Sequence, residues 1–151
     1  MRVVNSLLLK DNKILLLHKP SRNKWFLPGG KAEFGEDIVT TGCREFVEET
    51  GLSLISAKLT AATTVVVKDN EETKEWLLFT LKATDATGEL MPQTREGILR
   101  WHDAEAIETL AMFEGDRFIV KTLLEQDELI SSTQVYTPSY ELIELQTNNL
   151  K

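Results

Sequence analysis

Three glutamates lie close together in a segment that is typical of a helix. Glu45, Glu48 and Glu49 fall within residues 36–50, a stretch without proline. At 3.6 residues per turn, the three carboxylates lie within an arc of about 100° on one side of a helix. Like charges along one stripe repel each other and destabilise the helix unless a partner offsets the repulsion. Because Mg²⁺ prefers oxygen ligands, the stripe predicts a metal site.

The neighbouring residues favour a metal site over an ordinary solvated glutamate-rich helix. Gly29 and Gly30 lie just upstream, where backbone groups can approach a ligand without a Cβ in the way. Arg44 precedes Glu45, and a guanidinium can hold a carboxylate in one orientation. The other side of the helix is apolar, and we expect it to face the core: Val39, Cys43, Phe46 and Val47.

Charge is distributed unevenly along the 151 residues. The first 28 residues carry six basic side chains and one acidic one, whereas residues 29–52 carry six acidic side chains and two basic ones. Such runs are either solvated faces or a site that binds both an anion and a cation. The net charge of -7 argues against a general nucleic-acid binder and against docking on an anionic membrane.

The elements that would position these residues alternate between strands and helices. Asp11-Asn12 tolerates the positive φ of a tight hairpin turn, and Gly51 is a typical C-terminal cap of a helix. The predicted strands are residues 3–9, 13–17, 56–68, 75–83 and 97–101, with a weaker strand pair at 133–145 around Pro138. The predicted helices are residues 36–50, 103–110 and 116–128, and residues 84–97 are predicted to form a long loop.

Strands interrupted by two solid helices predict a mixed sheet with helices on its faces. No linker or repeat divides the chain, so we expect residues 1–151 to form a single domain. No apolar run is long enough to span a bilayer. Cys43 is the only cysteine and cannot form an internal disulfide, which favours a reducing, cytoplasmic location.

The residues around the glutamate stripe match the Nudix box, the pattern G-x5-E-x7-R-E-U-x-E-E-x-G-U in which U is bulky and apolar. The matching residues are Gly30, Glu36, Arg44, Glu45, Phe46, Glu48, Glu49, Gly51 and Leu52. Every defined position is met, so the chain resembles the Nudix hydrolase family. The resemblance implies an α/β/α sandwich with a central mixed sheet. It also implies hydrolysis of a nucleoside diphosphate linked to another moiety, with Mg²⁺ or Mn²⁺ as cofactor.

The resemblance also implies roles for individual residues. Glu48 and Glu49 would be metal ligands, with the Gly29 carbonyl as a further one. Glu45 would be either a ligand or the base that activates water, and Arg44 would orient Glu45.

Further site residues are expected outside the box. Glu96 resembles a loop carboxylate that MutT-type members bring to the metal, although an ordinary solvent-facing acid fits the sequence too. Lys19, Arg22 and Lys31 lie close to the box in sequence and are candidates to contact phosphates. For each of these bases, a solvated surface position is at least as well supported.

The segment around residue 116 is the candidate for base recognition. It resembles the region of MutT-type oxidised-purine triphosphatases in which an aromatic residue and acids contact the base. Phe113 could stack on a purine, and Asp116 could hydrogen-bond a base edge. Alternatively, Asp116 caps the following helix and Phe113 belongs to the core. Trp25 either lines the nucleotide cleft or packs before the Pro-Gly-Gly loop.

We therefore expect a MutT-type pyrophosphohydrolase that converts a nucleoside triphosphate, with 8-oxo-dGTP as one candidate, to a monophosphate and pyrophosphate. Alternatives are a Nudix hydrolase of nucleotide sugars, ADP-ribose, dinucleoside polyphosphates or RNA 5′ ends, and a nucleotide-sensing module without catalysis. The expected partner is a nucleotide substrate rather than a membrane or a stable nucleic-acid complex. Both a monomer and a homodimer are compatible with the sequence.

Overall fold

The computed structural model describes residues 1–149. Its helices are α1 (Ile38–Thr50), α2 (Glu114–Glu125) and the 3₁₀ helix η1 (Ala104–Glu108). Its first strands are β1 (Arg2–Lys10), β2 (Lys13–Lys19), β3 (Lys24–Phe26), β4 (Gly29–Lys31), β5 (Leu52–Ile55) and β6 (Lys58–Val67). The later strands are β7 (Lys74–Ala83), β8 (Asp85–Gly88), β9 (Gln93–Thr94), β10 (Gly97–Asp103), β11 (Ile130–Tyr136) and β12 (Leu142–Asn149).

The main sheet is mixed, and its two halves separate in a wedge shape between β1 and β2. Its strand order is β12-β11-β6-β7-β1-β2-β10-β9, with parallel pairing of β1 to β7 and of β11 to β6. Strands β1 and β2 pair only beside their connecting turn, at Leu9–Ile14 and Lys10–Lys13. Farther from the turn, β4 pairs with β1 and β3 pairs with β2. The two halves of the sheet therefore diverge, and β4 lies at the opening.

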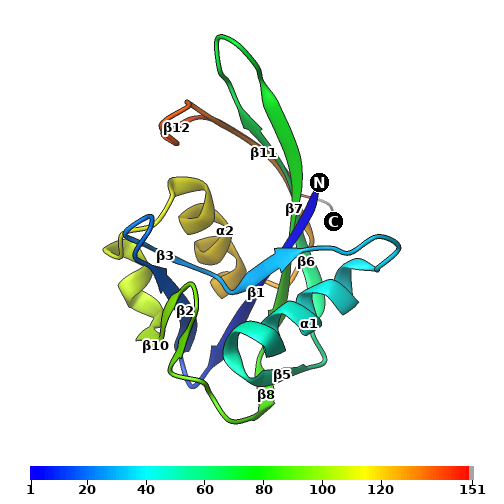
Figure 1. The fold of residues 1–151 in the computed structure, drawn as a ribbon, viewed down its shortest axis with the longest axis vertical. Helices are drawn as coiled ribbons and strands as arrows, with labels where there is room; N and C mark the ends of the chain where they lie inside the picture. The colour runs from blue at the N-terminus through cyan, green and yellow to red at the C-terminus, as the bar shows by residue number, and fades with distance from the viewer. Residues whose placement is uncertain (150–151) are drawn as a thin grey trace.

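Helices cover both faces of this sheet, as Figure 1 shows with α1 and α2 on opposite sides of β1. Helix α1 packs closely because Gly42 has no side chain, and a Cβ there would overlap Leu81 and Val4. Phe46, also on α1, is fully buried. On the other face, Ile119 and Leu123 of α2 belong to a core cluster of buried residues. This arrangement confirms the predicted α/β/α sandwich with a central mixed sheet.

Local signals in the sequence correctly place the first hairpin turn and the C-terminal end of α1, but not its first residue. Asp11 and Asn12 both have positive φ, 52° and 59°, as the hairpin prediction requires. Asp37 caps α1 by accepting a hydrogen bond from the Thr40 N–H at 3.0 Å, so the helix begins at residue 38 rather than 36. At the other end, Gly51 has a φ of 82° and its N–H bonds the Val47 carbonyl. These contacts fix the helix that carries the glutamates.

Three expectations about individual elements are wrong. Residues 84–97 are not one loop, because β8 pairs with β5 and β9 pairs with β10. Helix α2 begins at Glu114 and ends at Glu125, since Phe113 and Gln126 have extended backbones at its two ends. On α1, Val39 and Val47 are exposed, whereas Glu49 is only 9% exposed. The helix is therefore rotated so that one edge of the acidic stripe, and not Val39 or Val47, faces inward.

The tail confirms the predicted strand pair around Pro138. Strands β11 and β12 pair in antiparallel fashion, and β11 also pairs along its whole length with β6. Figure 1 shows this pair beside the projecting β6–β7 hairpin. The helices formed by residues 1–149 are all too short or too polar to cross a bilayer.

Candidate active site

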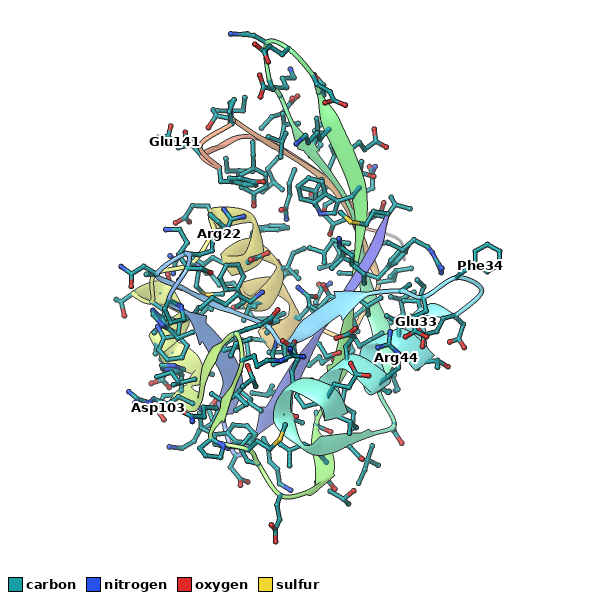
Figure 2. The ribbon with its side chains drawn as sticks, in the orientation of Figure 1. Arg22, Glu33, Phe34, Arg44, Asp103 and Glu141 are labelled. Atoms are coloured by element: carbon teal, nitrogen blue, oxygen red, sulfur yellow. The ribbon has the colours of Figure 1, made fainter. Side chains whose placement is uncertain are left out.

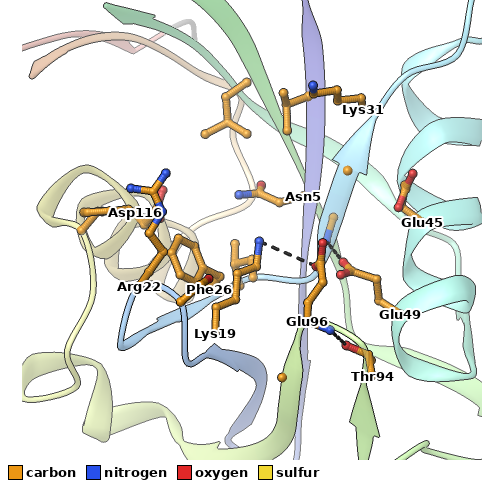
Figure 3. A pocket seen from close by; sticks show the side chains of 18 of the residues that line it. Asn5, Lys19, Arg22, Phe26, Lys31, Glu45, Glu49, Thr94, Glu96 and Asp116 are labelled. Atoms are coloured by element: carbon orange, nitrogen blue, oxygen red, sulfur yellow. Dashed lines mark hydrogen bonds and ion pairs between the residues drawn. The ribbon is translucent and has the colours of Figure 1, made fainter. Parts of the chain in front are cut away.

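The wedge between β1 and β2 forms a cleft with a volume of about 1410 Å³. Its walls come from β1, β4, α1, the segment around Glu96, the start of α2 and the β11–β12 turn. Figure 3 shows Glu45 and Glu49 at one end, Asp116 and Arg22 at the other, and Lys19 between them. The cleft is therefore acidic at one end and has a basic side chain in its middle.

Glu49 is the most buried carboxylate at the acidic end. It accepts a 2.6 Å hydrogen bond from the Gly29 N–H and shares another hydrogen bond with Glu96. Burial, followed by the contact with Glu96, raises the pKa of Glu49 well above its usual range, while the Gly29 N–H acts in the opposite direction. Two carboxylates in contact need either a shared proton or a cation between them.

The Arg44 guanidinium donates hydrogen bonds to the neighbouring carboxylates. Its Nε and Nη2 donate to the two oxygens of Glu36 at 2.8 and 2.9 Å, and its Nη1 donates to Glu45 at 3.0 Å and to Glu48 at 3.3 Å. Nη2 also bonds the Lys31 carbonyl at 3.2 Å. Hydrogen bonds from Arg44, then from Thr41, lower the pKa of Glu36 to about 2. Figure 2 shows Arg44 beside the loop that precedes α1.

Glycine at position 30 lets α1 approach β4, and glycine at position 29 lets β4 approach β1. A Cβ on Gly30 would overlap the carboxyl group of Glu45, and one on Gly29 would overlap the backbone of Val4 and Asn5. The Ser6 N–H bonds the Pro28 carbonyl across the β1–β4 pair. In an antiparallel pair, successive carbonyls point to alternate sides, so the Gly29 carbonyl points away from β1.

The donor set suits a divalent cation, but the ligands are not gathered. Among residues 1–149, no three side chains of Asp, Glu, His or Cys converge closely enough to hold a metal ion as they stand. The reason is electrostatic: Arg44 draws Glu45 and Glu48 toward itself, while Glu49 bonds Gly29 and Glu96. All four carboxylates line the same cleft, and oxygen donors of this kind are what Mg²⁺ and Mn²⁺ prefer.

The predicted phosphate contacts, Lys19, Arg22 and Lys31, all line the cleft, and Arg95 joins them. Lys19 lies 3.8 Å from a carboxylate oxygen of Glu96, and its Nζ is 4.7 Å from the centre of the Phe26 ring. The Lys19 ammonium group therefore lies beside the acidic end, where a ligand in the cleft can reach it. Arg22 is exposed at the mouth.

At the far end, Phe113 and Asp116 line the cleft as expected. Asp116 lies in the first turn of α2, but Phe113 occupies the N-cap position and no side chain caps the helix. The capping interpretation of Asp116 is therefore wrong. Burial raises the pKa of Asp116 to about 6, and the charge of Lys19 partly opposes the shift. Asp116 is thus a carboxyl group that can either accept or donate a hydrogen bond near neutral pH.

Trp25 does not line the cleft. Its ring packs edge-on between His18 and His102, with ring centres 4.9 and 4.3 Å away, and contacts the α2 core cluster. Successive side chains of a strand point to opposite faces, so the next residue, Phe26, takes the cleft position.

Several cleft residues were not singled out from the sequence. Asn5 is the clearest: its side-chain oxygen accepts a 2.7 Å hydrogen bond from Thr80, which turns its amide nitrogen toward the cleft. The available signal was a polar pair, Asn5 and Ser6, between the apolar residues of β1. Three further ones come from the tail, in which no motif marks them: Gln134, Tyr136 and Tyr140.

Replacing Gly30 by alanine is expected to lower kcat by roughly 10- to 100-fold, because the new Cβ displaces the Glu45 carboxyl group from β4. The thermal midpoint should change little, since the displaced group is the end of a partly exposed side chain. Steady-state kinetics and thermal melts check both. Unchanged kcat in a folded Gly30→Ala protein would mean that the position of Glu45 does not matter.

Comparison with known proteins agrees with this geometry. The NUDIX domain model matches residues 1–123. The chain is 40% identical over 143 residues to the uncharacterized Nudix hydrolase YvcI of Bacillus subtilis (strain 168), covering 94% of this chain and 90% of that protein. The crystal structure of the mutator MutT protein from Bacillus halodurans is similar with a TM-score of 0.94 and 39% identity, over 97% of both chains.

A more distant structure shares the fold alone. The NUDIX domain of Shewanella oneidensis NrtR, solved in complex with ADP ribose, matches with a TM-score of 0.68 and 16% identity, over 83% of this chain and 86% of that one. The segment matched by the family model covers most of the chain. It includes α1, which carries the glutamates, and the β4 glycine that makes room for this helix. The chain therefore belongs to the Nudix hydrolase family and is a MutT-type member of it.

Proposed function

We propose that this Nudix hydrolase cleaves a nucleoside triphosphate to a monophosphate and pyrophosphate, using Mg²⁺ or Mn²⁺. The observation that carries the proposal is the polarity of the cleft. Four carboxylates lie at one end, Lys19 lies in the middle, and an aromatic residue with Asp116 lies at the far end. A nucleoside triphosphate follows the same order: its phosphates suit the end with the carboxylates, a divalent ion and Lys19, and its planar base suits the aromatic end.

The proposed ligands are Glu48, Glu49, Glu96 and the Gly29 carbonyl, with Glu45 as a further ligand or as the general base. A bound divalent ion would neutralise phosphate charge and lower the pKa of a water molecule. The chain itself supplies the rest. Arg44 donates a hydrogen bond to the Glu45 carboxylate at 3.0 Å and so fixes its orientation. A carboxylate oriented in this way can accept a proton from water at the cleft surface.

The basic residues are proposed to bind the phosphates beyond the metal. Lys19 lies close to Glu96, so a phosphate attracted to it would lie beside the carboxylates. Arg22 and Lys31 line the cleft on either side and can follow a longer phosphate chain. Because these cations accompany the metal site, a protein with a net charge of -7 can still bind a polyanion.

Residues 1–151 are proposed to act as a single domain. The support is that β11, which follows the segment matched by the family model, pairs with β6 over the register Ile130–Ala61 to Tyr136–Val67. The tail thereby extends the sheet that carries the cleft.

Replacing Asp116 by asparagine is expected to change the base preference while the dependence on metal stays the same, because Asp116 lies at the end of the cleft away from the carboxylates. Comparing kcat/KM for the four common triphosphates and 8-oxo-dGTP in both proteins checks this. An equal loss for every base would mean that Asp116 does not read the base.

The stability of the Asp116→Asn protein should also depend on pH in a defined way. The folded-state pKa of Asp116 is raised from 3.8 to about 6, so its contribution to stability is present below pH 3.8 and is lost as pH rises through about 6. Because asparagine does not ionise, the variant loses no stability at this position as pH rises. The melting temperature of Asp116→Asn relative to wild type should therefore increase between pH 4 and 7; a constant difference would mean that burial does not raise this pKa.

A panel of substrates tests the proposed function. It contains nucleoside triphosphates, 8-oxo-dGTP, ADP-ribose, a nucleotide sugar, a dinucleoside polyphosphate and RNA with a 5′-triphosphate, each with Mg²⁺ and with Mn²⁺. The proposal predicts the highest kcat/KM for a nucleoside triphosphate and release of pyrophosphate. A higher value for another class would replace the proposed substrate.

A further inference from the structure

The C-terminal hairpin, residues 130–149, lies outside the segment 1–123 that the family model matches, yet it forms one wall of the cleft. It comprises β11, the turn around Pro138, and β12. Three of its side chains line the cleft: Gln134, Tyr136 and Tyr140. The hairpin can therefore contact a ligand that binds at the end of the cleft near Asp116.

Gln134 and Tyr136 clamp the start of α2 with a closed ring of hydrogen bonds. The Gly115 N–H donates to the Tyr136 hydroxyl at 3.0 Å, this hydroxyl donates to the Gln134 side-chain oxygen at 3.1 Å, and the Gln134 amide donates to the Gly115 carbonyl at 3.0 Å. Gln134 and Tyr136 are 1% and 4% exposed. A Cβ on Gly115 would overlap both. The clamp thus fixes the backbone immediately before Asp116.

Tyr140 occupies a backbone conformation that favours glycine or asparagine. Its φ is 64°, in the left-handed region, where a bulky residue is uncommon and costs conformational energy. Its ring lies 5.4 Å from Phe113, tilted by 32°, and the guanidinium of Arg22 lies 5.1 Å from the ring centre. The turn alone gives no reason for a tyrosine here. A strained aromatic residue lining a cleft points to a function for its ring.

We propose that the C-terminal hairpin builds the subsite for the nucleobase of the substrate. The rings of Tyr140 and Phe113 form an aromatic wall on which a planar base stacks, so Tyr140 supplies affinity for a base, while Asp116 distinguishes one base from another. Gln134 and Tyr136 are positioning residues, which act by holding Asp116 in reach of the edge of the base. The inference rests on the proposed nucleotide hydrolysis, because the phosphates must then lie toward the carboxylates.

Binding without turnover tests the subsite. Calorimetry in EDTA compares the four nucleoside 5′-monophosphates with ribose 5-phosphate, which lacks a base. Wild type should bind at least one monophosphate more tightly than ribose 5-phosphate, by roughly 5- to 150-fold, the range of one base–aromatic stack. Tyr140→Asn, which suits the left-handed backbone, should remove that preference without lowering the melting temperature. Tyr140→Phe keeps the ring and should retain the preference.

Two further variants complete the experiment. Glu141→Gln, an exposed neighbour in the same turn, is the matched control and should behave as wild type. Tyr136→Phe removes the hydroxyl from the clamp and should reduce the ratio of monophosphate to ribose 5-phosphate affinity. A lower melting temperature with an unchanged ratio would make Tyr136 merely structural and overturn its positioning role.

The outcomes separate this inference from the proposed reaction. If wild type prefers monophosphates over ribose 5-phosphate but cleaves no nucleotide, the base subsite stands and the proposed reaction fails. If wild type cleaves nucleotides while Tyr140→Asn keeps the full preference for the base, the subsite is overturned and the reaction stands. Equal binding of monophosphates and ribose 5-phosphate by wild type would also overturn it.

Discussion

Glu49→Gln is expected to lower kcat at least ~100-fold while leaving the protein folded. Glutamine keeps the shape of Glu49, but it removes the negative charge that a divalent ion needs. Its amide can still accept from the Gly29 N–H and can donate to Glu96, so the contacts that bury Glu49 survive. The repulsion between Glu49 and Glu96 disappears at the same time. The melting temperature without metal should therefore equal or exceed that of wild type.

Steady-state kinetics over a range of Mg²⁺ concentrations, together with thermal melts in EDTA, measure both parts of this prediction. Glu75→Gln, an exposed change of the same kind on β7, is the matched control and should leave kcat unaltered. Near-normal kcat for Glu49→Gln would mean that Glu49 is not a metal ligand. A large fall in melting temperature would mean that the lost activity reflects unfolding.

Arg44→Met is expected to lower both activity and stability. The substitution leaves Glu36, whose side chain is 11% exposed, without its two bonds from the guanidinium, and it releases Glu45 and Glu48 from their common partner. Loss of a residue that orients the ligands typically costs about 10- to 100-fold in activity or metal affinity. The melting temperature should also fall, because a carboxylate inside the loop-helix junction loses its counter-charge.

Raising the Mg²⁺ concentration separates the two effects of Arg44→Met. If Arg44 orients the acids, the variant should need more Mg²⁺ for half-maximal rate than wild type does. Lys121→Met removes an exposed cation that pairs with Glu108 on the other side of the molecule and should change neither quantity. An unaltered Mg²⁺ dependence in Arg44→Met would contradict an orienting role and leave only a role in stability.

Sequence predicts those parts of the site that depend on neighbours along the chain. The left-handed Gly51 and the hairpin at Asp11-Asn12 are local, because the residues that determine them lie within a few positions. The Nudix pattern likewise lies within one continuous segment, from β4 through α1 to the start of β5. Its glycines are explained by the structure, since Gly30 makes room for the Glu45 carboxyl group.

Other parts depend on pairing between distant segments, which a single sequence does not reveal. The helical spacing places Glu49 on the acidic stripe but does not say which edge of the stripe turns inward. On β3, a shift of one residue decides between Trp25 and Phe26, because neighbouring side chains point to opposite faces. Tyr140 reaches the cleft only because β11 pairs in parallel with β6, a contact between segments far apart in the chain.

The most direct test of the account is to follow the products of nucleoside triphosphate hydrolysis by ³¹P nuclear magnetic resonance, for the wild type with Mg²⁺, for the wild type with EDTA, and for Glu49→Gln with Mg²⁺. We predict monophosphate and pyrophosphate with wild type and Mg²⁺, and almost no conversion in the other two samples. Absence of turnover with either Mg²⁺ or Mn²⁺, or equal turnover in all three samples, would contradict a metal-dependent hydrolase site at Glu49.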